Sequence, residues 1–115
     1  MGHAVTHFEI LGPDGEALQR YYADLFGWSV DASNPMKYRM VQATAPGIGG
    51  GVAGSQDGSS FVTFYVQTDD IKGSLAKAES LGGKTVQEPM DIPDGPTIAL
   101  FADPQGNVIG LASGM

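Results

Sequence analysis

Hydrophobic positions in the first half of the chain switch from strand spacing to helix spacing and back. Residues 4–11 are rich in β-branched and aromatic side chains, which predicts a strand. Five large residues then recur at the spacing of a buried helix face: Leu18, Tyr21, Tyr22, Leu25 and Phe26. Asp14 is suited to cap the start of this helix, and Gly27 to end it. Further strands are predicted at 28–30, 38–44 and 49–54.

The same succession returns in the second half. A strand is predicted at 61–67, and Asp70 is placed to cap a second helix. The apolar face of that helix is Ile71, Leu75, Ala78 and Leu81. Three more strands are predicted at 84–87, 97–102 and 108–112. The last two are joined by a turn, Asp-Pro-Gln-Gly-Asn, in which proline presets the bend and glycine accepts a positive φ.

Similar residues recur in the two halves at a constant spacing of 56, with no insertion or deletion. Asp14 recurs as Asp70, and Gly54 as Gly110. The repeat predicts an α+β fold in which two βαβββ modules, residues 3–55 and 60–115, form one domain with one curved mixed sheet around a cleft. A ligand is expected in that cleft. His7 of the first copy corresponds to Thr63 of the second, so the copies are not chemically equivalent.

The composition narrows the classes of partner. The chain has 6 basic and 13 acidic residues and a net charge of −7, which argues against nucleic acid or an anionic membrane as partner. It has no cysteine, so disulfides, thiolate metal sites and cysteine nucleophiles are excluded. No signal peptide and no apolar stretch of about 20 residues is found. A small folded protein of the cytoplasm is expected.

Five segments of the chain resemble the vicinal oxygen chelate superfamily, which includes glyoxalase I, extradiol dioxygenases and bleomycin-resistance proteins. They are the strand Thr-His-Phe-Glu-Ile, the helix end Tyr-Tyr-Ala-Asp-Leu-Phe-Gly-Trp, the segment Phe-Tyr-Val-Gln-Thr-Asp-Asp-Ile, the helix stop Leu-Gly-Gly-Lys-Thr-Val and the closing Phe-Ala-Asp-Pro-Gln-Gly-Asn-Val-Ile-Gly-Leu. Together they span nearly the whole chain. The resemblance implies the same fold and, because that family often pairs two such domains, a homodimer.

The resemblance also implies four positions for a divalent metal. Metal enzymes of that superfamily hold the ion with a His or similar residue on the first strand of each copy and usually a Glu on the last strand of each copy. These positions fall on His7, Thr63, Gly54 and Gly110. A threonine hydroxyl is a poor ligand for Zn²⁺, Ni²⁺, Mn²⁺ or Fe²⁺, and glycine offers no side chain. Metal-free function is therefore expected, with a divalent metal as the alternative.

Several side chains are candidates to contact a ligand in the cleft. Glu9 shares a strand face with His7, and the pair could hold a proton or a weakly bound metal, or be a plain salt link. Tyr65 shares a face with Thr63 and could stack on a ligand or fill the wall. The complete set of expected ligand-binding residues is His7, Glu9, Tyr38, Met40, Thr63 and Tyr65. His7 and Glu9 are also the candidates for any catalytic role.

Three functions therefore stand as alternatives. The first is metal-independent binding of a small organic molecule, as in bleomycin-resistance proteins. The second is a metal-dependent glyoxalase-like lyase or a dioxygenase with a non-standard ligand set, in which His7 and Glu9 take part. The third is an interaction domain with a vestigial cleft. The sequence does not identify a ligand.

Overall fold

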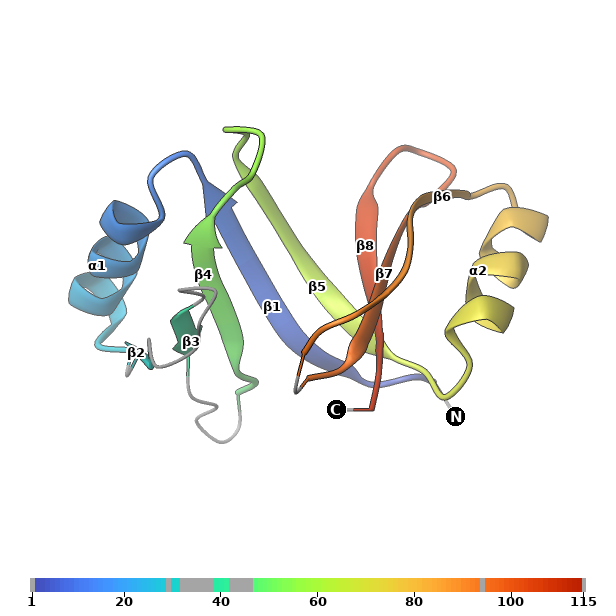
Figure 1. Cartoon of the computed structure of the whole chain (residues 1–115), viewed down its shortest axis with the longest axis horizontal. Helices are drawn as coiled ribbons and strands as arrows, with labels where there is room; N and C mark the ends of the chain where they lie inside the picture. The colour runs from blue at the N-terminus through green and yellow to red at the C-terminus, as the bar shows by residue number, and fades with distance from the viewer. Residues whose placement is uncertain (1, 29, 32–38, 42–46, 94, 115) are drawn as a thin grey trace. The chain divides into compact units, whose positions relative to one another are not determined.

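The computed structural model describes residues 2–28, 30–31, 39–41, 47–93 and 95–114. The elements follow the predicted order, βαβββ twice (Figure 1). The first half contains β1 (Val5–Gly12), α1 (Gly15–Phe26), β2 (Val30–Asp31), β3 (Arg39–Val41) and β4 (Gly50–Gly54). The second half contains β5 (Phe61–Gln67), α2 (Ile71–Ser80), β6 (Lys84–Asp91), β7 (Thr97–Ala102) and β8 (Val108–Ser113).

The chain divides into two compact units, which are described separately. One unit is His7–Thr63, with the strand order β2-β3-β4-β1. The other is Met1–Thr6 together with Phe64–Met115, with the order β5-β8-β7-β6. Each mixes strand directions, because β1 runs parallel to β4 and β5 parallel to β8, while the remaining neighbours pair antiparallel. The predicted α+β class with mixed strand pairing is confirmed.

The first residues of the chain belong with the second half because they bond to the end of β5. The Gln67 amide donates to the Ala4 carbonyl at 2.9 Å. The His3 imidazole donates from Nδ1 to the Gln67 carbonyl at 2.9 Å. A carbonyl oxygen only accepts, so Nδ1 of His3 carries the proton in this arrangement. The start of β1 therefore completes the unit to which β5 contributes.

Both helices begin as predicted, and α1 also ends as predicted. Asp14 Oδ1 accepts from the Ala17 amide at 3.1 Å, and Asp70 Oδ1 accepts from the Gly73 amide at 2.9 Å. Each carboxylate thus satisfies an amide that the helix itself leaves unpaired. Gly27 ends α1 with φ 68°, in the left-handed region that glycine adopts without strain. Neither described helix is long and apolar enough to cross a membrane.

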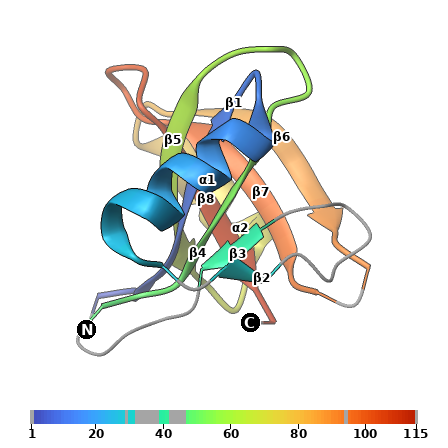
Figure 2. The same ribbon diagram turned by 90° about the vertical axis from the view of Figure 1, so that its left-hand side faces the viewer.

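The face by which α1 packs differs from the predicted one. Tyr21, Leu25 and Phe26 are 59%, 55% and 57% exposed, although the helical spacing predicts them buried. The buried member of α1 is Gln19, whose Nε2 donates to the carbonyl of Val52 in β4 at 2.8 Å. Figure 2 shows α1 lying across the strands of its unit. The helix was therefore predicted correctly, but the side of it that faces the sheet was not. The buried position is occupied by Gln19 with its hydrogen bond to a backbone carbonyl, and not by one of the apolar side chains of the pattern.

A cluster of aromatic rings connects the C-terminal part of α1 to β1 in this first unit. The Tyr22 ring lies 6.1 Å from Phe26 and 5.7 Å from Trp28, centroid to centroid. Trp28 in turn lies 5.2 Å from Phe8 in β1. These separations are typical of favourable aromatic pairs. The cluster therefore ties the end of α1 to the sheet even though part of it is exposed.

The core of the second unit lies between α2 and its strands. It consists of Ile71, Leu75, Ala99 and Leu111, with Val66 and Phe101 packed against them. The prediction that Leu81 is buried with the helix face is wrong, because Leu81 is 71% exposed. It stands at the C-terminal cap, one position beyond the last residue of α2, where the helical face no longer continues.

β6 is longer than predicted and reaches Asp91 rather than ending at residue 87. Its pairing with β7 shifts register twice, between Thr85 and Gln87 and between Gln87 and Met90. Pro89 falls within the second shift. Proline lacks an amide proton and is tolerated at bulges and on edge strands, and β6 stands at the end of the strand order in its unit. Pro89 therefore lies inside β6, although a proline is more often found where a strand ends.

Candidate functional site

The alternation of side chains along β1 places His7 and Glu9 on one face of the strand. Both are half-buried. The neighbouring parallel strand β4 pairs Gly51 with Glu9 and Ala53 with Leu11. Paired residues of neighbouring strands share a face, so His7 and Glu9 stand beside residues with little or no side chain. Phe8 points to the other face, where its ring meets Trp28.

Burial lowers the pKa of His7 below its ordinary value of 6.5. Desolvation disfavours the charged imidazolium, so the neutral ring predominates near neutral pH. A neutral imidazole accepts a hydrogen bond or a proton through one nitrogen and donates through the other. His7 can therefore serve as a polar contact, a proton acceptor or a metal ligand, as the sequence suggests.

β5 carries the other two ligand candidates on one face. Thr63 and Tyr65 are each 5% exposed, whereas Val62 and Phe64 between them are 71% and 39% exposed. The strand thus buries its polar and aromatic pair and exposes two of its hydrophobic residues. That pattern is opposite to the one expected of a simple half-buried strand.

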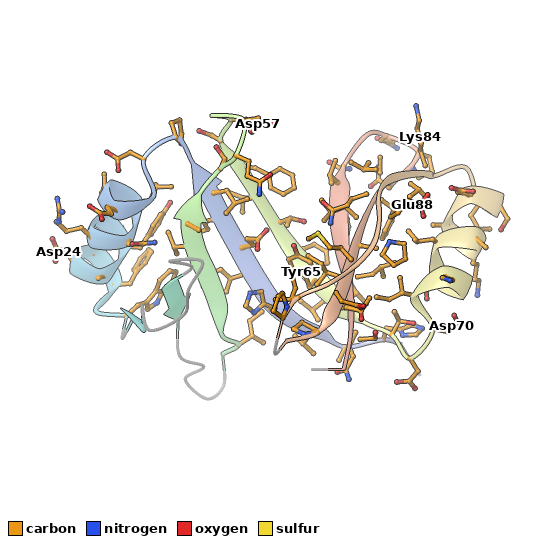
Figure 3. The ribbon with its side chains drawn as sticks, in the orientation of Figure 1. Asp24, Asp57, Tyr65, Asp70, Lys84 and Glu88 are labelled. Carbon is orange, nitrogen blue, oxygen red and sulfur yellow. The ribbon has the colours of Figure 1, made fainter. Side chains whose placement is uncertain are left out.

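The ring of Tyr65, which is labelled in Figure 3, lies against Gly110, its partner on the parallel strand β8. An ideal Cβ at Gly110 would stand 2.4 Å from Cδ2 and 2.5 Å from Cε2 of that ring. Real Cβ atoms are not found so close to a neighbouring heavy atom. Gly110 can therefore carry no side chain while Tyr65 keeps its place, and the position at which the resemblance implies a metal-binding glutamate is filled by a ring.

The constant sequence spacing predicts a repeat without insertions, but the strand pairing shows that the two copies differ in length. Phe8 pairs with Gly50, 42 residues later, whereas Tyr65 pairs with Gly110, 45 residues later. The second copy is thus three residues longer between its first and last strands. With the first strands equivalent at a spacing of 56, the structural counterpart of Gly110 is Gly51 and not Gly54.

Gly54 lies on the opposite face from His7. It pairs with Gly12, and an ideal Cβ would stand 3.6 Å from the amide nitrogen of Gly15, at the start of α1. A side chain at Gly51, by contrast, would share the face of Glu9, its register partner. Because Gly51 is also a glycine, the chemical expectation of a missing carboxylate is unchanged by the shift.

The residues at these positions do not fit a divalent metal. Within the described ranges, no three His, Cys, Asp or Glu side chains gather closely enough to hold an ion. Tyr38 lies outside the described residues. Met40 lies in β3, where its backbone is the partner of Gly51. The structure thus places His7 with Glu9 and Thr63 with Tyr65 on shared strand faces, and separates Gly54 from the face it was assigned to.

The family model described as Glyoxalase/Bleomycin resistance protein/Dioxygenase superfamily matches residues 4–111. The chain belongs to this superfamily. A sequence relative is the anthracycline biosynthesis protein DnrV of Streptomyces peucetius, 26% identical over 90% of this chain. Another is the putative glyoxylase CFP32 of Mycobacterium tuberculosis, 30% identical over 72% of this chain. The chain spans 44% and 32% of the lengths of these two proteins, less than half of each.

Solved structures show the same fold. A superfamily member from Vibrio splendidus superposes with a TM-score of 0.65 at 16% identity, covering 97% of this chain and 99% of the other. A methylmalonyl-CoA epimerase of Streptomyces coelicolor, solved with 2-nitronate-propionyl-CoA, gives 0.64 at 16% identity, covering 96% of each chain. At these identities the likeness establishes the fold alone.

Gly51 is the residue of this glyoxalase-like domain that sequence reasoning missed. Its position depends on the pairing register between β1 and β4, which sequence spacing does not reveal when one copy has a longer connection. The available signal was the sequence just before each last strand, which is Asp-Pro-Gln-Gly-Asn before β8 and Ala-Pro-Gly-Ile-Gly before β4. Aligning the copies on the ends of their last strands would have exposed the difference.

Proposed function

We propose that this glyoxalase-like domain binds a small organic molecule without a metal, in the manner of bleomycin-resistance proteins. The packing of Tyr65 on Gly110 carries the proposal, because it fills with an aromatic ring a position where a metal enzyme of the superfamily would present a carboxylate. Thr63 adds a hydroxyl where an imidazole would be needed, and a hydroxyl binds transition metals poorly.

The His7 face offers what such a ligand requires. His7 supplies a neutral hydrogen-bonding ring, and Glu9 supplies an acceptor two residues along the same strand. Gly51 and Ala53 of β4 add little or no side chain beside them on that face. Ligand sites commonly combine limited polar groups with close backbone approach. We therefore propose His7 and Glu9 as the polar contacts of the ligand.

Purification without chelator, followed by elemental analysis and native mass spectrometry, tests this function. We expect metal far below one ion per chain and a small molecule that leaves on mild activation. His7→Ala should lose that molecule, while Lys72→Gln, which changes an exposed residue of the other unit that does not line the pocket there, should retain it. Near-stoichiometric Zn, Ni, Mn or Fe would overturn metal-free binding.

The alternative is a metal-dependent glyoxalase-like lyase or a dioxygenase with a non-standard ligand set. One observation favours keeping it, which is the lowered pKa of His7, since metals bind neutral imidazole. In that case Glu9 would be the second protein ligand or the base. Assays of metal-loaded protein on glyoxalase and dioxygenase substrates test it, and an activity that survives His7→Ala would remove His7 from the reaction.

The proposal includes a homodimer in the cytoplasm. DnrV and CFP32 are more than twice the length of this chain, so each has room for a second domain of this kind. A second copy would supply that domain here. Light scattering coupled to size-exclusion chromatography should give twice the monomer mass of 12.0 kDa, and a monomer at all concentrations would contradict it.

A further inference from the structure

A pocket that shares no residue with the His7 face lies in the unit formed by Met1–Thr6 and Phe64–Met115. Its volume is about 400 Å³, within the range of small-molecule sites. All of its lining residues belong to this unit. It opens between α2, the sheet and the turn after β7, where the end of α2 and that turn lie side by side (Figure 1).

The floor of this α2 pocket is apolar and continuous with the core. Val66, Phe101 and Leu111 line it, and all three belong to the cluster packed under α2. Its lip is apolar as well, since Leu81 is 71% exposed and Pro104 is exposed beside it. An ideal Cβ at Gly82 would stand 3.5 Å from Cγ of Pro104, so the backbone just after α2 passes close to the turn that follows β7. An exposed leucine next to an apolar floor gives a ligand apolar surface to cover.

Two charged side chains stand at the rim of the pocket, Asp103 and Lys77, and Asp103 is hydrogen-bonded within its own turn. The Asp103 carboxylate accepts from the Gln105 amide at 2.9 Å and from the amide and the Nδ2 of Asn107 at 3.0 and 2.9 Å. These bonds, that of the Asn107 side chain foremost, hold the pKa of Asp103 below its ordinary value. Its charge is thereby engaged within its own turn.

Lys77 supplies the opposite charge at the rim. It stands in the last turn of α2 and is exposed. No ion pair of its ammonium is found among the residues that the structure describes. The chain has only 6 basic residues and a net charge of −7, so a lysine at the rim of an apolar pocket favours an anionic ligand there. His3 adds an imidazole to the same lining, with Nδ1 bonded to the Gln67 carbonyl.

The geometry points to a binding site in the α2 pocket for a small hydrophobic carboxylate, its apolar body on Val66, Phe101 and Leu111 and its carboxylate at Lys77. The apolar body gains free energy by leaving water, and the carboxylate keeps a charged partner at the exposed rim. This site does not depend on the function proposed for the His7 face, since it uses none of the same residues.

Titration of the whole protein with octanoate, followed by ¹⁵N NMR, tests the site, with 1-octanol as the neutral probe of equal chain length. We expect saturable shifts at 77–83 and 101–104. Lys77→Gln should weaken octanoate about two- to fivefold, the range of an exposed ion pair, and leave octanol unchanged. Leu81→Asp should weaken both probes. Both residues are exposed, so neither change threatens the fold.

Lys72→Gln is the matched control, because Lys72 is exposed on the same helix and does not line the pocket. It should leave both affinities at the wild-type value. The site is overturned if octanoate causes no saturable shift, or if the shifts fall outside this unit. The carboxylate assignment is overturned if Lys72→Gln and Lys77→Gln weaken octanoate equally, or if Lys77→Gln weakens octanol as much as octanoate.

Discussion

The Tyr65 ring covers Gly110 so closely that a methyl group on Gly110 would stand 2.4 Å from the ring atom Cδ2. The two residues are register partners on the parallel strands β5 and β8. A similar relationship joins Phe8 to Gly50 in the other unit, where an ideal Cβ would lie 2.4 Å from the ring. In each case an aromatic side chain packs on the bare backbone of the neighbouring parallel strand.

Gly110→Ala should therefore destabilise the protein by about 1–3 kcal/mol, the usual effect of overpacking a buried site. Urea unfolding measures the change. The loss should be much smaller in a Tyr65→Val background, where the ring is gone, so a double-mutant cycle should give a clear coupling energy. Gly54→Ala is the control, because its nearest contact is an ordinary 3.6 Å and its effect should be small. Equal losses in both backgrounds would contradict the packing of Tyr65 on Gly110.

The free energy of unfolding should decrease as the pH is lowered, because His7 then becomes protonated more readily in the unfolded chain than in the folded one. Its pKa is lowered by burial, so between the lowered value and 6.5 the unfolded chain binds more protons than the folded one. The contribution of neutral His7 is complete above about pH 6.5 and is lost as the pH falls through the lowered pKa. His7→Gln should show a smaller decrease in unfolding free energy between about pH 7 and pH 5.

Gln56→Ala supplies the comparison for that pH series, because Gln56 is exposed and carries no titratable group. Its unfolding free energy should follow the wild-type pH dependence. If His7→Gln instead follows the wild type, His7 is not the group whose burial makes stability depend on pH in this range.

Two leucines on the two helices should respond differently to truncation. Leu75 of α2 is 5% exposed and belongs to the core, whereas Leu25 of α1 is 55% exposed. Leu75→Ala should cost about 2–5 kcal/mol. Leu25→Ala should stay within about 0.5 kcal/mol in the monomer. Thermal or urea unfolding at low protein concentration compares them, and a large loss for Leu25→Ala would restore the helix face predicted from the sequence.

Asp70 and Asp69 are adjacent carboxylates with different roles. Asp70 accepts from the Gly73 amide at 2.9 Å and begins α2. Asp70→Ala should cost about 1 kcal/mol, the usual contribution of a helix cap. Asp69→Ala should cost less than half of that. Chemical denaturation of the two variants measures these changes in the free energy of unfolding. Equal decreases for Asp70→Ala and Asp69→Ala would mean that the helix cap does not depend on Asp70.

The elements could be predicted because each depends on neighbours in sequence. Asp14, Asp70 and Gly27 mark helix ends through bonds that span a few residues, and these predictions are confirmed. The phase of α1 could not be read in this way. It depends on the bond from Gln19 to Val52, 33 residues away, and no local pattern distinguishes a buried glutamine from a solvated one.

The strand faces of the candidate site could be predicted, whereas the pairing register of the strands could not. His7, Glu9, Thr63 and Tyr65 could be assigned to shared strand faces by alternation alone. The counterpart of Gly110 could not be found, because the connection in the second copy is three residues longer and only strand pairing shows where the difference is absorbed. Aromatic packing on a glycine is equally invisible to periodicity, since the glycine contributes no side chain to the pattern.

The bonds that tie the N-terminus to β5 also order the events of folding. His3 and Gln67 are 64 residues apart, so the segment before β1 lacks this partner until β5 has been made. Until β5 is synthesised, the start of β1 is an open strand edge, with amides and carbonyls available to other chains. The unit formed by Met1–Thr6 and Phe64–Met115 therefore cannot be completed until both of its distant segments are present.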